Sequence, residues 1–218
     1  MTEEVFENRE IRIEKLIVGP FSENCYLVNR KNSKKCFLVD PGYDASKILN
    51  GISSLDLEVK YVMVTHGHAD HTGAIAHIKR AYNFNIVLGD GDQDLYENPD
   101  KWLVDLFPDY ELPPKEYLVL PNDTKIEFDG LSINILKTPG HTKGSLCFQL
   151  SGFVFTGDTL FKNSIGRYDL PGGDMNEELH SIKTKLLPLE NDSIILPGHG
   201  DSSTVGHEKI NNPYLRDS

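Results

Sequence analysis

Apolar segments separated by short polar turns predict regular elements in both halves of the chain. In the first forty residues they predict three antiparallel strands, at 11–18, 24–29 and 35–39. A helix from 45 to 49 or beyond, a strand at 59–65, a helix at about 71–82 and a strand at 86–88 follow. The first half therefore begins as a meander and continues with alternating strands and helices.

The second half repeats this arrangement without visible sequence repetition. Apolar runs predict strands at 125–128, 131–136, 145–150 and 153–156, then a helix at 175–187 and a last strand at 193–196. Strands in both halves with helices after each set predict an α/β fold in which two sheets pack face to face beneath outer helices.

A looser segment separates the halves. Prolines recur from about residue 90 to 121 among Trp102, Phe107 and other aromatic residues, which is too aromatic for a disordered linker. It predicts an ordered insertion or lid near the site, or a surface loop with its own small core. The whole chain of 218 residues fits a single domain that includes this insertion.

Composition excludes several classes of protein. A net charge of -11 would repel nucleic acid, and no apolar stretch has the length of a membrane span. The acidic amino terminus lacks a secretory core, so the expected location is cytoplasmic, and no obligate protein partner is evident. Three cysteines, Cys25, Cys36 and Cys147, lie in apolar segments and are predicted to be buried, inert thiols.

The strongest chemical signal is the segment from Thr65 to His71. It places three histidines and one aspartate directly after the apolar run 61–64, which is typical of metal binding where a strand ends. His66 and His68 occupy alternate positions and can face one ion. Asp70 is predicted as an N-cap and His71 as the first turn of the next helix, where both can serve a second ion.

Three further ligand-type residues follow strand-like segments, each directly after a glycine. These residues are His141, Asp158 and His199. A glycine before the ligand permits the tight or positive-φ backbone that turns a side chain off a strand end. Jointly the chain supplies five histidines and two aspartates, the right number for two ions that share a carboxylate. The remaining histidines, His77, His180 and His207, are predicted to be structural or solvent-facing.

On these motifs the chain resembles the metallo-β-lactamase superfamily from about residue 11 to 199. Within it, the chain is similar to the short glyoxalase-II-like (hydroxyacylglutathione hydrolase-like) proteins that lack the C-terminal helical domain. The resemblance implies an αββα four-layer sandwich of two mixed sheets flanked by helices. It also implies two divalent metal ions, zinc foremost, although iron and manganese accept the same ligands.

The resemblance further implies a division of the ligands between the two ions. His66, His68 and His141 would hold one ion, Asp70, His71 and His199 the other, and Asp158 would bridge them. Asp70 and Asp158 would be the catalytic residues. The implied reaction is hydrolysis of a small-molecule thioester, such as an S-acylglutathione, by a metal-bound hydroxide.

Substrate recognition is implied at the run from Gly166 to Asp169. Arg167 matches the basic position of full-length glyoxalase II, whereas Asp169 stands where an aromatic residue is expected. Arg167 is therefore predicted to bind a substrate carboxylate, with a structural ion pair to Asp169 as the alternative.

Two other functions use the same ligands. A mononuclear iron persulfide dioxygenase would need only His66, His141 and Asp158, as a two-histidine, one-carboxylate triad. A non-catalytic metal-binding protein is the alternative outside enzymology, but all seven expected positions hold competent side chains.

Overall fold

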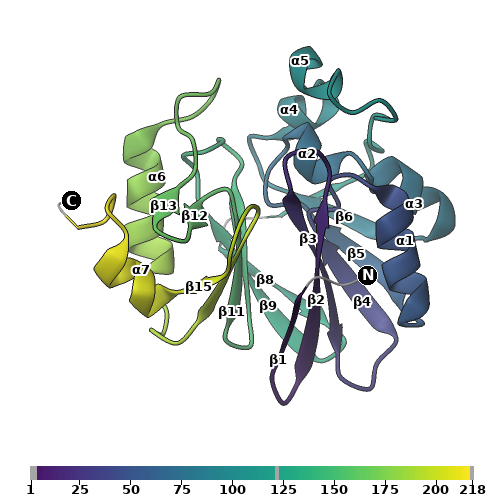
Figure 1. The fold of residues 1–218 in the computed structure, drawn as a ribbon, viewed down its shortest axis with the longest axis horizontal. Coiled ribbons are helices and arrows are strands. Elements are labelled where there is room, and N and C mark those ends of the chain that lie inside the picture. The colour runs from purple at the N-terminus through teal and green to yellow at the C-terminus, as the bar shows by residue number, and fades with distance from the viewer. Residues whose placement is uncertain (1–3, 121–122, 217–218) are drawn as a thin grey trace.

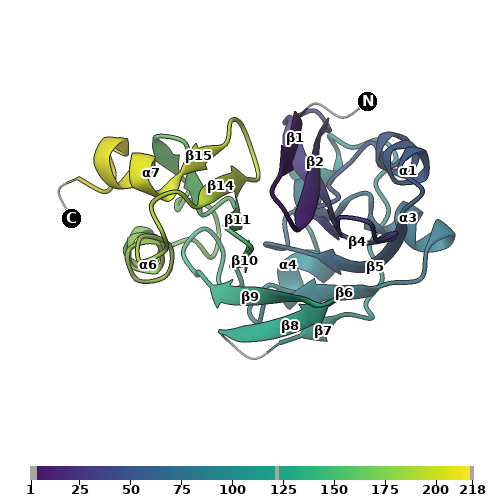
Figure 2. The same ribbon diagram turned by 90° about the horizontal axis from the view of Figure 1, so that it is seen from below.

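The protein is a four-layer sandwich in the computed structural model, which describes residues 4–120 and 123–216 (Figure 1). Two large sheets pack face to face. Helices α1 and α3 cover the outer face of the first sheet, and α6 and α7 lie on the outer side of the second (Figure 2). This arrangement confirms the predicted α/β fold of two mixed sheets flanked by helices.

Each large sheet is mixed in strand direction. The first has the order β1-β2-β3-β4-β5-β6-β7, with antiparallel pairs up to β4 and parallel pairs from β4 to β7. The second has the order β15-β14-β11-β10-β9-β8, with one parallel pair, β11 and β14. A small hairpin is formed by β12 and β13.

The strands of the first sheet are β1 (Glu4–Glu7), β2 (Ile11–Val18), β3 (Glu23–Arg30), β4 (Lys35–Val39), β5 (Glu58–Met63), β6 (Asn85–Leu88) and β7 (Leu118–Val119). The second sheet and the hairpin contain β8 (Thr124–Phe128), β9 (Leu131–Lys137), β10 (Leu146–Leu150), β11 (Phe153–Gly157), β12 (Leu160–Phe161), β13 (Ser164–Ile165), β14 (Ile194–Pro197) and β15 (Ser203–Thr204). The helices are α1 (Ala45–Ser54), α2 (Ala69–Thr72), α3 (Ile75–Ala81), α4 (Gln93–Glu97), α5 (Lys101–Val104), α6 (Met175–Ser181), the π-helical continuation η1 (Ile182–Leu186) and α7 (Val205–Asn211).

The core between the sheets is aromatic. Phe37 of β4 and Phe155 of β11 face each other with ring centroids 6.4 Å apart, and Tyr26 packs on Phe155 at 5.2 Å. Central strands such as β4 are apolar on both faces because helices cover the side away from this core. The sheets are thereby fixed relative to each other, and so are the loops at their ends.

The predicted helix at 71–82 is wrong in one respect, because the structure has two helices there. The chain breaks between α2 and α3 at Gly73, whose position is so crowded that a Cβ would lie 2.5 Å from the carbonyl oxygen of Gly42. The predicted N-cap is also wrong: His68 occupies that position, and Asp70 lies in the first turn of α2. The short turn lets Asp70 and His71 face the strand ends.

Several short elements were not predicted from the pattern, namely β1, β7, β12, β13, β15, α4, α5 and α7. Most of them are too short for a hydrophobic period to appear. In the insertion, α4, α5 and β7 occur, and Leu103 and Phe107 pack with Ala69 in a small separate core. The predicted end of the insertion, Pro121, lies outside the described residues.

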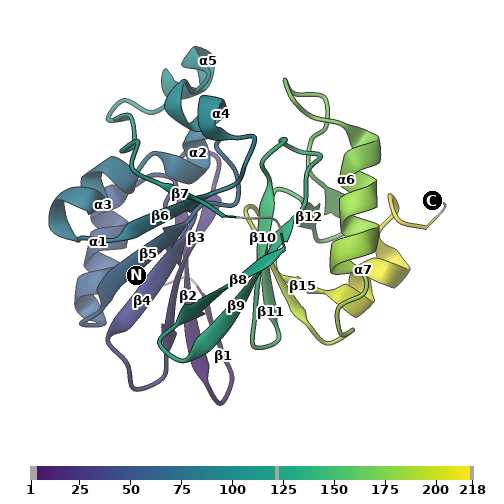
Figure 3. The same cartoon turned by 180° about the vertical axis from the view of Figure 1, so that it is seen from behind.

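None of the helices in residues 4–120 and 123–216 is both long enough and apolar enough to span a membrane. The view from behind shows α4 and α5 at one end of the sandwich, at the same end as the segment that leads into α6 (Figure 3).

Candidate metal centre

The predicted ligands meet because the carboxyl ends of four strands lie at the same edge of the sandwich. His66 follows β5, His141 follows β9, Asp158 follows β11 and His199 follows β14. These strands come from both sheets, so each sheet contributes ligands. The other predicted ligands, His68, Asp70 and His71, come from the same β5–α2 segment.

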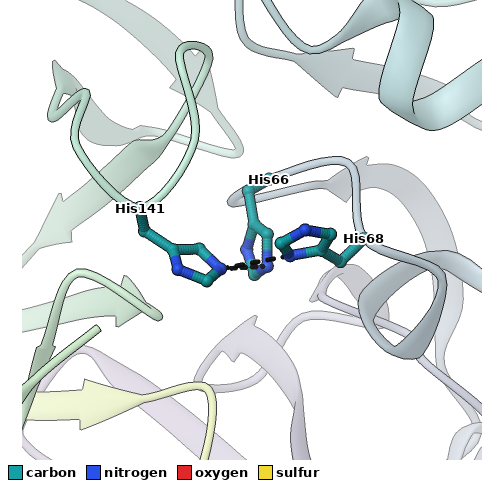
Figure 4. A group of neighbouring side chains, drawn as sticks. All are labelled: His66, His68 and His141. Atoms are coloured by element: carbon teal, nitrogen blue, oxygen red, sulfur yellow. Dashed lines mark hydrogen bonds between the residues drawn. The ribbon is translucent and has the colours of Figure 1, made fainter. Parts of the chain in front are cut away.

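Three imidazole nitrogens converge in the first group (Figure 4). His141 Nε2 lies 3.2 Å from His66 Nε2 and 3.1 Å from His68 Nδ1. Zinc–nitrogen bonds of 2.0–2.1 Å at a tetrahedral centre separate their nitrogens by about 3.3 Å. The spacing of these three nitrogens therefore fits one ion.

The second group lies beside the first. His71 Nε2 is 3.3 Å from His199 Nε2, and Asp70 Oδ2 is 3.5 Å from His199 Nε2. Asp158 stands between the groups: its Oδ1 is 3.4 Å from His71 Nε2, and its Oδ2 is 3.9 Å from His141 Nε2. Asp158 Oδ1 is buried without a hydrogen-bond partner among the described residues, as expected for an oxygen that ligates a cation. The residues present therefore fit two ions that share this carboxylate.

Hydrogen bonds behind the rings fix which nitrogen faces the site. His141 Nδ1 lies 2.7 Å from the carbonyl oxygen of Arg167, and His199 Nδ1 lies 3.1 Å from that of Phe21. A carbonyl can only accept, so in both rings Nδ1–H donates and Nε2 keeps its lone pair for a metal.

Two of the remaining three rings, those of His66 and His71, rest on Asp40, a buried residue that follows β4. Asp40 Oδ2 accepts from Thr65 Oγ1 at 2.6 Å and lies 3.0 Å from His71 Nδ1. Thr65 Oγ1, whose proton goes to Asp40, can accept from His66 Nδ1 at 3.1 Å. The sequence analysis did not single out Asp40, because its contacts with Thr65 and His71 come from segments 25 or more residues away.

Burial favours the neutral form of two histidines in the first group, which is the form that binds a metal. Burial lowers the pKa of His66 well below its ordinary value and lowers that of His68 to about 4. Burial opposes protonation of His71 as well, but Asp158 and Asp70 outweigh it and raise the pKa of His71. The second group is therefore rich in negative charge and suits a cation.

The glycines that precede the ligands serve different purposes. Gly140 and Gly157 adopt φ values of 148° and 48°, as the tight-turn prediction requires. Gly198 instead supplies space, because a Cβ there would lie 2.4 Å from Asp158 Oδ1 and 2.6 Å from His71 Cε1.

A second buried aspartate, Asp92, joins the two loops of the first group. Its carboxylate accepts from the backbone N–H of Gly67 at 2.9 Å, from that of Gly144 at 2.8 Å and from Thr142 Oγ1 at 2.8 Å. Gly67 lies between His66 and His68, while Thr142 follows His141. Asp92 was missed because nothing in the sequence around it distinguishes it from other aspartates of the insertion.

A cavity of about 410 Å³ opens above the ligands. Arg167 lines it, together with site residues such as His68 and Asp158. Arg167 also forms the alternative contact, a two-pronged ion pair with Asp169 at 3.0 and 3.1 Å. Both side chains of this pair are exposed, so the pair contributes little stability and can exchange for a ligand carboxylate.

The histidines predicted to lie outside the site do so. His77 faces Glu111 from α3 with 3.5 Å between Nε2 and Oε1, and His207 Nε2 lies 2.9 Å from Asn163 Oδ1. His180 lies in the last turn of α6. None of the three belongs to a metal-competent cluster among the described residues.

Comparison with known proteins gives a consistent picture. The sequence model of the metallo-beta-lactamase superfamily matches residues 18–199. The hydroxyacylglutathione hydrolase GloC of Haemophilus influenzae is 36% identical, over 94% of this chain and 98% of its own.

Two solved structures are similar over nearly their whole lengths. TTHA1623 in a di-iron-bound form is 34% identical, with a TM-score of 0.84 over 92% of this chain and 99% of its own. The BLEG-1 B3 metallo-beta-lactamase is 29% identical, with a TM-score of 0.87 over 94% and 99%.

Proposed function

Because the chain belongs to the metallo-beta-lactamase superfamily, we propose that it is a metal-dependent hydrolase that cleaves small-molecule thioesters. The observation that carries the proposal is the convergence of seven ligand-type residues into two groups that share Asp158. The name of the Haemophilus influenzae relative, a hydroxyacylglutathione hydrolase, supports a thioester as the substrate class.

The residues divide the work of hydrolysis, which converts a thioester and water into a carboxylate and a thiol. Two divalent ions held by the two ligand groups that share Asp158 would polarise the thioester carbonyl and lower the pKa of a bound water toward ~7. The carbonyls of Arg167 and Phe21 hold the rings of His141 and His199 in orientation.

The carboxylate of Asp70 supplies negative charge and a hydrogen-bond acceptor beside the attacking water. Burial opposes ionisation of Asp70, but His71 and His199 lower its pKa below the ordinary value. Asp70 is therefore ionised at neutral pH and can accept a hydrogen bond from the attacking water. Arg167, which lines the same cavity, is free to exchange Asp169 for an anionic group of the substrate.

A metal and activity comparison of three variants tests this function. We expect Asp158→Ala and His141→Ala to lose metal and thioester hydrolysis together, because both contribute ligand atoms. His77→Ala is the matched control, since it removes a histidine outside the site and should retain both. Retention of metal content and turnover in Asp158→Ala would contradict the proposal.

The persulfide dioxygenase is a second candidate, favoured by the proximity of its three ligands. His141 Nε2 lies 3.2 Å from His66 Nε2 and 3.9 Å from Asp158 Oδ2, close enough for a two-histidine, one-carboxylate triad. Parallel assays separate the two functions. Oxygen uptake on a persulfide by the iron-loaded protein, without cleavage of any thioester, would replace the hydrolase assignment.

A further inference from the structure

The metal cavity has an apolar wall, although metal ligands and the polar side chains of Asp100, Ser164 and Arg167 line it as well. Side chains from three separate segments line it: Phe21 from the β2–β3 turn, Trp102 from α5, and Phe161, Ile165 and Leu170 from the segment after Asp158. In Figure 1, α5 and the segment that leads into α6 rise at the same end of the sheets. The apolar wall is thus assembled from both halves of the fold.

Trp102 is the most exposed member of this wall. It is 57% exposed, more than any other large aromatic side chain of the described residues, and it lines the cavity. Phe21 of the same wall is 40% exposed. Exposed apolar side chains that gather at a cavity mark ligand-binding sites, so this pair points to a ligand with an apolar surface.

The position of Trp102 is fixed by its neighbours. The next residue, Leu103, is buried and packs in the small core with Ala69, which lies between His68 and Asp70. Phe107 belongs to the same core, and its ring lies 5.9 Å from that of Phe21. The apolar wall is thus anchored to the helix that carries the ligands and is preformed.

We propose that this wall binds the acyl group of the substrate, and that the acyl group is an apolar aliphatic or aryl chain. The inference rests on the proposed thioester hydrolysis and names its substrate class. A small hydroxyacyl group would leave most of the apolar wall exposed, whereas a longer chain covers Trp102. Each methylene that becomes buried should improve binding about fourfold, which corresponds to ~0.8 kcal/mol.

Trp102 offers a direct assay because it is the only tryptophan in the chain. Zinc-loaded protein is titrated with non-hydrolysable S-alkyl thioethers of N-acetylcysteamine that carry two, four, six or eight carbons, and the tryptophan fluorescence is recorded. The same protein is assayed for hydrolysis of the matching S-acyl thioesters and of S-lactoyl-N-acetylcysteamine. This small neutral thiol isolates the contribution of the acyl side.

We expect Kd to fall about fourfold per methylene until the chain outgrows the cavity, with a change in Trp102 fluorescence. In hydrolysis, kcat/KM for hexanoyl should exceed that for lactoyl by roughly 10- to 60-fold, since hexanoyl has three more carbons. Trp102→Ala should flatten the dependence on chain length and Trp102→Phe should largely restore it. Leu106→Ala, an exposed apolar residue of the same insertion outside the lining, should keep it.

Two results would overturn the inference. One is binding that does not depend on chain length; the other is an unchanged chain-length dependence of kcat/KM in Trp102→Ala. Failure of the proposed function looks different, since chain-dependent quenching by the thioethers would remain while no thioester was hydrolysed. Trp102 is exposed, so its replacement leaves the fold intact and the comparison interpretable.

Discussion

Replacement of Asp92 by alanine should weaken metal binding by the first group of ligands and leave metal binding by the second group unchanged. Asp92 accepts from the backbone N–H of Gly67 and of Gly144, and so joins the loop of His66 and His68 to the loop that follows His141. Asp92 forms no hydrogen bond with Asp70, His71 or His199 in the part of the chain that the structure describes; the rings of His71 and His199 are oriented by Asp40 and by the carbonyl of Phe21. The two groups therefore respond differently to its removal.

The size of the effect follows from the groups that are left behind. Two buried backbone N–H groups lose their acceptor at about 1–3 kcal/mol each, whereas Thr142 keeps Ser145 Oγ at 2.7 Å. Burial raises the pKa of Asp92, so removal of the carboxylate relieves part of this cost. We expect the free energy of unfolding to fall by about 2–3 kcal/mol, or about 4–12 °C in Tm for a chain of this size.

Metal release measures the selective part of the prediction. Loss of a residue that orients ligands typically lowers metal affinity 10- to 100-fold. Under a graded chelator challenge, Asp92→Ala should lose one ion per chain early and the second at the wild-type chelator concentration. Asp90→Asn, an exposed neighbour in the same loop, is the control. A folded Asp92→Ala protein that released both ions at wild-type concentrations, or both early in one step, would refute the reasoning.

Three other changes have defined outcomes. Gly198→Ala should lower metal content and turnover without unfolding the protein, since its Cβ would collide with Asp158 and His71. Gly200→Ala should cost stability, because its φ is 76°, but should keep the metal, because a Cβ there meets nothing within 4 Å; equal metal content in both variants would contradict the assignment. Chelation should lower Tm, and added metal should restore it. If free metal stands at 100 times its Kd, its removal lowers the free energy of unfolding by about 2.7 kcal/mol. A Tm that does not change with metal would argue against bound ions. Burial raises the pKa of Glu178 to about 9, so the folded metal-free protein retains a proton that the unfolded chain loses above its ordinary pKa of 4.5. Stability from this group is present below pH 4.5 and is lost as pH rises toward 9, and Glu178→Gln should flatten that decline in denaturant titrations; an unaltered slope would show that Glu178 is ionised in the fold.

The strand pattern and the ligand motifs could be read from sequence because each is local. The histidines and aspartates carry their signal in spacing from strand ends, and the structure brings all seven together. Asp92 and Asp40 act across the fold, since they contact loops 25 or more residues away. Their roles depend on strand order and therefore could not be predicted from their own segments.

The break between the short helices, like the apolar wall, could not be predicted from the sequence for a similar reason. The break at Gly73 depends on the approach of Gly42 from another loop, which no helical period reveals. The wall combines Phe21, Trp102 and Phe161, which lie far apart in the chain. The cytoplasmic location and the absence of an obligate protein partner stay predictions.

Two residues at the cavity each serve two purposes, one through the main chain and one through the side chain. Phe21 and Arg167 each orient a ligand histidine through the main-chain carbonyl, while their side chains line the cavity. Because every residue type carries that carbonyl, the side chains at these two positions can be exchanged without removal of the hydrogen bonds that orient the rings. Substrate preference in this scaffold can therefore diverge by substitution at positions 21 and 167 while the water-activating apparatus stays the same.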